Sequence, residues 1–204
     1  MNERGFTVAN VNYRQELVPF DRKTLLERIK AQLSDGRFQH VLRVEQTALD
    51  LAERYGGDKQ RAGLAGLVHD YAKQRPDEEY KALIRTEGFD PELLAYNNGI
   101  WHGVVGAFII ERELGIHDEQ ILNAVRRHTI GSDNMTKLDK IIFVADFIEP
   151  GRDFPGIEAA RQAAATSLDA GVAFEIKQTL NYLLSTNKKI YPKTIATYNA
   201  YVAK

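Results

Sequence analysis

Apolar residues recur every three or four positions through most of the chain, and this helical periodicity is the feature that most limits its fold. Leu25, Ile29 and Leu33 form one such face, and Val44 and Ala48 belong to the next. No segment alternates apolar and polar residues with period two over a useful length, so strands are not expected. The sequence therefore predicts an all-α fold.

Capping residues and helix breakers give the expected boundaries. Asp21 begins the first helix, which Asp35-Gly36 should end. Residues 1–20 lack periodicity and are expected to form an N-terminal extension that touches the body through Leu17, Val18 and Phe20. The helices expected after the first cover about 37–55, 58–75, 76–87, a segment from 90, 103–114, 118–128, 136–148, two helices within 157–186 that join near 169–171, and a short one from about 194.

The composition is that of an ordinary globular chain, with 44% hydrophobic and 27% charged residues among 204. The net charge of −1 gives no general attraction to nucleic acid or to an anionic membrane, so an anionic ligand would need a local cluster of Arg and Lys. The absence of cysteine excludes disulfides and thiolate chemistry. No apolar run reaches the ~18 residues of a membrane-spanning helix, and we expect a cytoplasmic protein.

Histidine is scarce, and four of the five histidines share a pattern with two aspartates. Each member lies in or beside an apolar run of helical spacing. A single histidine in such a run is usually a core residue with a satisfied hydrogen bond, but the combined pattern favours a metal site built from several helices. The set comprises His40, His69, Asp70, His102, His128 and Asp146.

The adjacent pair His69-Asp70 is the most informative part of this set. Two neighbouring residues on a helix differ by about 100° in direction, so Asp70 could reach a second metal while His69 binds the first. Imidazole and carboxylate ligands without sulfur suit Fe, Mn, Zn or Co better than Mg or Ca alone. The pattern therefore predicts one or two divalent ions. His117 begins a helix away from this pattern and is expected to be exposed.

Basic residues stand at regular offsets from the expected ligands. Arg37 lies three residues before His40, and Lys73 lies four after His69, so each pair would share a helix face. Arg152 is a further candidate phosphate ligand on this reasoning, and Arg127 is another candidate, for which a solvated Arg126-Arg127 pair is the alternative.

Two neighbouring features leave their roles open. Thr129 either donates to a phosphate or caps a helix, and Glu149-Pro150 either orients Arg152 or only ends a helix.

The order of these residues resembles the HD-domain metal-dependent phosphohydrolases, which are helical bundles. The resemblance is closer to the YqeK-type symmetrical bis(5'-nucleosyl)-tetraphosphatases and runs from about residue 21 to the C-terminus, which would make 21–204 the HD hydrolase domain. The motifs that carry it are Arg37-x-x-His40, Ala65-Gly66-Leu67-Val68-His69-Asp70-Tyr71-Ala72-Lys73, His102-Gly103-x-x-Gly106-Ala107, Arg127-His128-Thr129-x-Gly131 and Ala145-Asp146-x-Ile148-Glu149-Pro150-x-Arg152.

The resemblance implies a role for each matched residue. The first metal would be held by His40, His69, Asp70 and Asp146, and a second by Asp70, His102 and His128. Iron is the first choice, with Mn, Co or Zn as alternatives. Asp70, Lys73 and Arg152 would be catalytic. The nucleotide would contact Arg37, Asp70, Tyr71, Ala72, Lys73, His102, Arg127, His128, Thr129, Asp146, Arg152, Lys188, Lys189, Ile190, Tyr191, Pro192 and Lys193.

The activity implied is cleavage of diadenosine tetraphosphate, a dinucleoside polyphosphate, into two ADP by a metal-bound hydroxide. The alternatives are another HD-type nucleotide phosphohydrolase, such as a nucleotidase or phosphodiesterase, and a nucleotide-binding sensor whose metal is only structural. Neither nucleic acid nor a membrane is expected as a partner, and a homodimer is left open.

Overall fold

The computed structural model describes residues 9–203, and this part of the chain is helical without any strand. The all-α prediction is therefore confirmed. None of its helices combines the length and the apolar character needed to cross a bilayer. The elements are α1 (Arg22–Gln32), α2 (Asp35–Tyr55), α3 (Lys59–Val68), α4 (Asp77–Thr86), the 3-10 helix η1 (Pro91–Ala95), α5 (Asn98–Val104), α6 (Gly106–Leu114), α7 (Glu119–Arg127), α8 (Lys137–Ile148), α9 (Ile157–Thr166), α10 (Leu168–Ser185) and α11 (Pro192–Tyr201).

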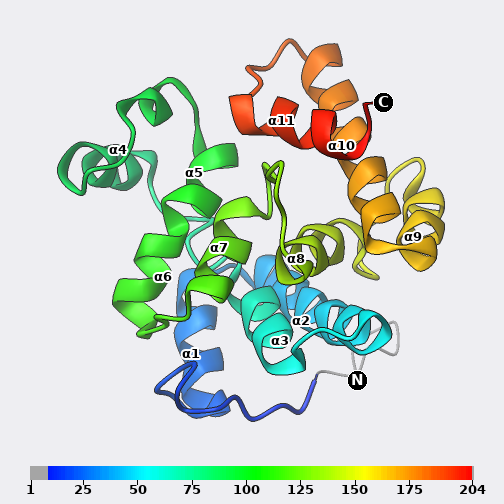
Figure 1. The fold of residues 1–204 in the computed structure, drawn as a ribbon. Coiled ribbons are helices and arrows are strands. Elements are labelled where there is room, and N and C mark those ends of the chain that lie inside the picture. The colour runs from blue at the N-terminus through cyan, green and yellow to red at the C-terminus, as the bar shows by residue number, and fades with distance from the viewer. Residues whose placement is uncertain (1–8, 204) are drawn as a thin grey trace.

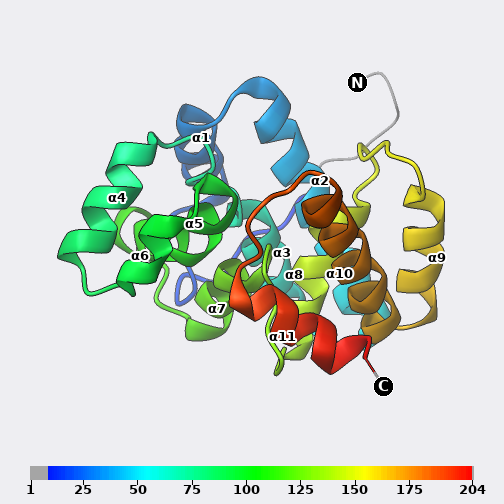
Figure 2. The same ribbon diagram turned by 90° about the horizontal axis from the view of Figure 1, so that it is seen from above.

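Helices α2, α3, α7 and α8 form the middle of the molecule, as both ribbon views show (Figures 1 and 2). Helices α4, α5 and α6 lie on one side of them, and α9 and α10 lie on the other, with α11 packed against α10. The core is continuous and includes Val44, Leu64, Val125 and Ile142, all fully buried. Every residue of the expected metal set lies in or beside the middle helices or α5.

Short polar side chains begin most of these helices, as the sequence predicts. The carboxylate of Asp21 accepts from the backbone N–H of Thr24, and Asp58 and Asp118 each accept from two N–H groups of the first turn that follows. Thr136 and Asp139 form a reciprocal capping box at the start of α8. These caps fix where α3, α7 and α8 begin, and therefore which way they present their last turns.

The predicted boundaries need correction at several points. Asp35 and Gly36 belong to the first turn of α2, because Ser34 provides the cap by accepting from the N–H of Arg37. Helix α3 ends at Val68, so His69 and Asp70 lie in the tight turns that follow it, where Tyr71 N–H donates to Val68 O. The predicted continuation to residue 75 is therefore wrong, and the 100° argument does not apply to this pair.

The remaining corrections concern smaller shifts. The helix expected over 103–114 is divided at Val105, so that His102 ends up inside a separate short helix. The junction expected near 169–171 lies at Ser167, whose extended backbone and side-chain cap begin α10. Helix α11 begins at Pro192 rather than near 194, because proline is well suited to a first helical turn.

The described part of the N-terminal extension packs closely on the body. Leu17 and Val18 are buried as expected, and Tyr13 is also buried, with its hydroxyl donating to Glu45 of α2. Arg22 forms a two-pronged ion pair with the same carboxylate. Residues 1–8 of the extension lie outside the described residues. The division of the chain at residue 20 stays a prediction.

Candidate metal centre

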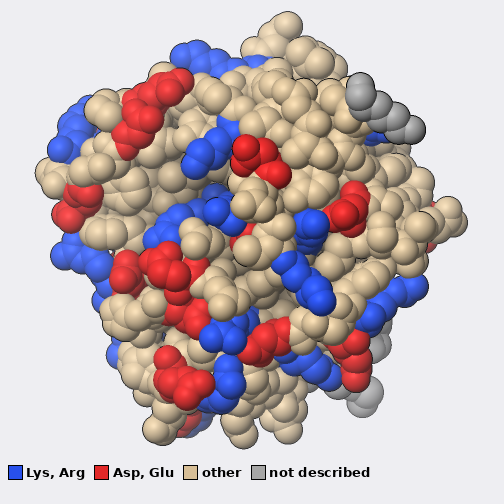
Figure 3. Space-filling model, viewed as in Figure 1, with Lys and Arg blue, Asp and Glu red and all other residues tan. Residues whose placement is uncertain are grey.

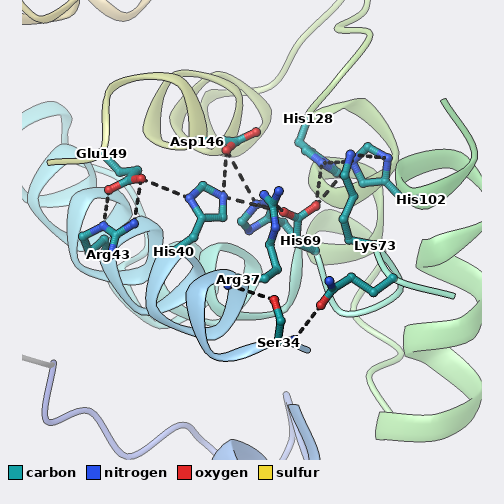
Figure 4. A network of polar contacts seen from close by, with 12 residues as sticks. Ser34, Arg37, His40, Arg43, His69, Lys73, His102, His128, Asp146 and Glu149 are labelled. Carbon is teal, nitrogen blue, oxygen red and sulfur yellow. Dashed lines mark hydrogen bonds and ion pairs between the residues drawn. The ribbon is translucent and has the colours of Figure 1, made fainter. Parts of the chain in front are cut away.

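Six buried or nearly buried side chains from five parts of the chain converge on one centre (Figure 4). Helix α2 supplies His40 from its second turn, α5 supplies His102, and His128 lies at the C-terminal cap of α7. The turn after α3 supplies His69 and Asp70, and α8 supplies Asp146 from its last turn. The structure thus brings together the whole set that the sequence singled out.

All four histidines are anchored through Nδ1. The Nδ1 atom of His69 lies 2.7 Å from Gly66 O, that of His128 lies 2.6 Å from Val125 O, and that of His102 lies 2.5 Å from Asn98 O. A carbonyl oxygen can only accept, so Nδ1 carries the proton and Nε2 presents a lone pair to the centre. His40 is held in the same way by the carboxylate of Glu149, 3.1 Å away.

The inward-facing nitrogen atoms fit a cation. Within the described residues, the buried Nε2 atoms of His40 and His69 have no hydrogen-bond partner. The Nε2 atoms of His102 and His128 lie 3.0 Å apart, an arrangement in which two lone pairs repel unless a positive charge lies between them. Nitrogen lone pairs that point inward without a hydrogen-bond partner are expected in a ligand set for a divalent metal.

Asp70 lies between the two halves of the centre. Its Oδ2 atom is 3.6 Å from Nε2 of His40 and 3.5 Å from that of His69. Its Oδ1 atom is 3.4 Å from Nε2 of His102 and 3.9 Å from that of His128. One carboxylate therefore turns one oxygen to each pair of histidines, which is the arrangement of a bridging ligand.

Asp146 completes the half that contains His40. Its Oδ1 atom lies 3.1 Å from Nε2 of His40 and 3.8 Å from that of His69. The three residues form one group whose ligand atoms are close enough to share an ion, and His69, Asp70 and His128 form a second such group. The two groups share His69, and together they include five of the six residues of the set.

Burial and local charge favour the ionisation states that metal ligands need. Burial first, and then the neighbouring His69, lower the pKa of His128 to about 4, and burial together with Lys73 lowers that of His102 well below 6.5. Burial opposes the charged form of Asp70, but His69, His102 and Lys73 outweigh it and hold the pKa of Asp70 well below 3.8. These groups offer neutral imidazoles and an ionised carboxylate.

The His40 half differs in its protonation. Burial disfavours the charge on His40, yet the nearby carboxylates of Asp146 and Glu149 prevail and raise the pKa of His40 above 6.5. Burial likewise opposes the charge on Asp146, but its contacts with His40 and Arg152 hold the pKa of Asp146 well below 3.8. A proton therefore competes with a metal at His40 more effectively than at His102 or His128.

Three cations surround the centre. The Nη1 atom of Arg37 donates to Asp70 Oδ2 at 2.8 Å, and Arg152 pairs with the Asp146 carboxylate and donates to its backbone oxygen. The Nζ atom of Lys73 lies 3.2 Å from both ring nitrogens of His102. Each arginine has further N–H donors for an anion. The face in Figure 3 carries Lys and Arg interspersed with Asp and Glu, so this local cluster is the feature suited to phosphate.

A cleft of about 540 Å³ adjoins the centre between η1, the start of α5, α10 and the loop before α11. Thr129 connects the two places, because it follows His128 and its buried hydroxyl lines the cleft without a hydrogen-bond partner within the described residues. The other lining residues are Ala95, Tyr96, Asn97, Gly99, Ile100, Thr179, Tyr182, Leu183, Lys188, Lys189, Tyr191 and Thr194.

Comparisons with known proteins agree with this geometry. Residues 37–151 match the HD domain family. The chain is 44% identical over 179 residues to a symmetrical bis(5'-nucleosyl)-tetraphosphatase of Bacillus subtilis, covering 88% of this chain and 96% of that protein. A protein of the same name from Staphylococcus aureus is 41% identical over 84% of this chain and 90% of its own length.

The chain belongs to the HD-domain symmetrical bis(5'-nucleosyl)-tetraphosphatase family. A solved structure described as a predicted HD superfamily hydrolase involved in NAD metabolism, from Clostridium acetobutylicum, superposes with a TM-score of 0.86 at 33% identity. The superposition covers 90% of this chain and 98% of the chain of the solved structure. As an HD-domain protein, the chain binds divalent metal, and the clustered ligands described above fit that property.

Some residues that the family resemblance assigned to nucleotide binding have side chains engaged in other contacts. Arg127 pairs with Asp139, the buried capping residue of α8, at 2.5 Å. Tyr71 is buried, with its hydroxyl donating to Glu113, and Ala72 is buried in the core. Their nucleotide contacts stay predictions.

The segment from residue 188 to 193 divides between two places. The cleft described above is lined by Lys188, Lys189 and Tyr191. A smaller hollow beside Arg127 is lined by Lys193. His117 is exposed as expected, with 74% of its side chain accessible.

Sequence reasoning did not identify two residues of this HD-domain site. Arg43 forms an ion pair with Glu149, and its position three residues after His40 on one helix was the available signal. Glu175 of α10 is buried, and burial followed by the charge of Asp146 raises its pKa well above 4.5. Its local sequence, Phe174-Glu175-Ile176, carries no signal of this.

Proposed function

We propose that this protein hydrolyses diadenosine tetraphosphate symmetrically to two ADP. The observation that supports it most directly is the position of Asp70, which has a pair of histidines near each carboxylate oxygen. Relatives of the same family that match nearly their whole length carry the name of this activity. The cysteine-free composition is compatible with the cytoplasm, where we propose that it acts. A homodimer stays a prediction.

The residues present suit two divalent ions. His40, His69 and Asp146 would hold one ion and His102 and His128 the other, with Asp70 between them. Such ions supply, when bound, an activated water and neutralisation of phosphate charge. We propose iron as the first choice, with manganese, cobalt or zinc as alternatives, since the ligands are nitrogen and oxygen without sulfur.

The cations of the chain would hold the centre of the polyphosphate. Arg37, Lys73 and Arg152 surround the ligands, and guanidinium groups bind phosphate oxygens through paired N–H donors. As a water oxygen bonds to one inner phosphorus, the bond from that phosphorus to the bridging oxygen breaks. The bridging oxygen leaves with the second ADP, and the water's proton is released. Charge develops on the phosphate oxygens during this step, where the three cations stabilise it.

One adenosine would occupy the cleft beside Thr129. Lys189 donates to Ala95 O across the cleft, and Tyr96 and Tyr191 lie edge to face with ring centroids 4.9 Å apart. Aromatic rings of this kind offer a surface on which a purine can stack. The unpartnered hydroxyl of Thr129 would bond to the nucleotide between this cleft and the metals.

Product analysis separates this proposal from the alternatives. The metal-loaded protein is incubated with diadenosine tetraphosphate, deoxynucleoside triphosphates, nucleoside monophosphates and cyclic nucleotides, and the products are separated by chromatography. We expect rapid hydrolysis of the dinucleotide with ADP as its sole product. Preference for a mononucleotide or cyclic nucleotide would support another HD-type phosphohydrolase, and binding of nucleotides without turnover would support a sensor.

Arg152→Ala tests the role given to the cations. We expect kcat to fall at least tenfold, because Arg152 reaches the centre through Asp146. Arg126→Ala is the matched control, since Arg126 pairs with Glu119 and Asn123 at the surface. Equal activities in the two variants would contradict this role.

A further inference from the structure

His40 is anchored differently from the other three histidines. Their Nδ1 partners are backbone oxygens three or four residues earlier in the same stretch of chain. The partner of His40 is the side chain of Glu149, 109 positions away at the end of α8. The orientation of this one ring therefore depends on a charged group brought in by the tertiary structure.

Two carboxylates at the end of α8 flank the two nitrogens of the His40 ring. Glu149 accepts from Nδ1 at 3.1 Å, and Asp146, one turn earlier, lies 3.1 Å from Nε2. Both contacts are drawn in Figure 4, where the ring of His40 lies between the two carboxylates. Any displacement of Glu149 would leave the ring free to turn its Nε2 atom away from the centre.

Glu149 is itself fixed by donors on every side. Arg43 donates to both of its oxygens, and the N–H of Gly151 donates to Oε2 at 2.5 Å. The Glu149 side chain is only 2% exposed. A carboxylate buried in this way needs such partners, because burial of an unpaired charge is costly.

The surrounding chain is shaped to admit Arg43. A Cβ atom at position 151 would lie 2.4 Å from Nε and Nη2 of Arg43, so glycine leaves the space that the guanidinium fills. Arg161 of α9 donates to the backbone oxygens of Ile148, Glu149 and Arg152. The turn that ends α8 is thereby tied to both α2 and α9.

We propose that Glu149, held by Arg43, is a positioning residue that fixes the tautomer and orientation of His40 and strengthens it as a metal ligand. This inference rests on the metal centre proposed above and does not depend on which phosphate ester is cut. A carboxylate that accepts from the far nitrogen of a histidine raises the basicity of the ligating nitrogen, and removal of such a partner typically weakens metal binding about 10–100-fold.

The test measures Mn²⁺ affinity without substrate, by competition with a chelator. Glu149→Gln should bind one of two Mn²⁺ ions about 10–100-fold more weakly and leave the other unchanged. Arg43→Ala should weaken the same ion, and Arg43→Lys should recover part of the loss. Glu113→Gln is the matched control, because Glu113 also pairs with an arginine, Arg75, but touches no histidine. It should bind both ions like the wild type.

A spectroscopic measurement separates positioning from a general loss of structure. In metal-free protein with ¹⁵N-labelled histidine, His40 should show a proton on Nδ1, and this signature should be lost or mixed in Glu149→Ala while His69 and His128 keep theirs. Glu149→Leu, which has no acceptor for Nδ1, provides the same reading if the alanine variant does not fold. Wild-type Mn²⁺ affinity in Glu149→Gln, or an unchanged His40 tautomer in the variants that lack an acceptor at position 149, would overturn the proposal.

Discussion

Replacement of Gly66 by alanine should weaken both the fold and the metal centre. A Cβ atom there would lie 3.1 Å from Val44 O and 3.2 Å from the Cα atom of Glu45, and backbone atoms of α2 cannot easily yield. Overpacking of this kind costs about 1–3 kcal/mol, against a gain of about 1 kcal/mol from the higher helix propensity of alanine. We therefore expect a net loss of roughly 0–2 kcal/mol in the free energy of unfolding.

Gly36→Ala is the matched comparison, because a Cβ atom at Gly36 would meet nothing within 4 Å and the residue also lies in a helix. It should stabilise the protein by up to about 1 kcal/mol. The propensity gain is common to both variants, so their difference measures overpacking alone, about 2 kcal/mol or roughly 4–8 °C in Tm for a chain of this size.

The assay is urea unfolding of the metal-free proteins, followed by Mn²⁺ titration of each. The backbone oxygen of Gly66 accepts from His69 Nδ1, so a displaced α3 should also move His69 relative to His40 on α2 and weaken metal binding. Equal stability of the two alanine variants would refute the argument that close approach of α2 and α3 positions the site.

Further predictions concern the ligands directly. His69→Ala or Asp70→Ala should abolish turnover and lower metal content in elemental analysis, while exposed His117→Ala should leave activity within a factor of about two; full activity in either ligand variant would disprove the assignment. His102→Ala and His128→Ala should reduce bound metal from two ions toward one, and an unchanged metal complement would contradict the two-ion arrangement. The pKa of His128 falls from 6.5 to about 4 on folding, so metal-free protein should lose about 3 kcal/mol of stability from this group as pH falls from 6.5 to 4, a slope that urea unfolding should find missing in His128→Gln.

The helical pattern and the ligand set could be predicted because each depends on local signals. Capping residues such as Asp58 and Thr136 indicate where helices begin. Histidine is scarce in this sequence, and its repeated occurrence on apolar helix faces indicates a buried site. The end of α3 could not be predicted, because Ala72 and Tyr71 continue an apolar pattern although the chain has already left the helix. Local helix propensity carries no information about the tertiary contacts that determine where a helix ends.

The pairing of side chains from distant parts of the chain could not be predicted from the sequence either. Arg127 directly precedes the ligand His128 in the sequence, yet Asp139, twelve residues later, pairs with it. The role of Glu149 was left between orientation of Arg152 and helix termination, and the structure turns its side chain to His40 and Arg43 instead. Offsets along one helix report a shared face, and they do not report which group from another helix meets it.

Isotope tracing in heavy-oxygen water tests the central claim most directly. Diadenosine tetraphosphate is hydrolysed by the metal-loaded protein in ¹⁸O-labelled water, and the products are analysed by mass spectrometry. Attack of one water at one inner phosphorus predicts ADP as the sole nucleotide, with a single heavy oxygen on the terminal phosphate of one of the two ADP molecules formed per turnover. Equimolar ATP and AMP would show asymmetric attack and would contradict the placement of the polyphosphate centre beside Asp70.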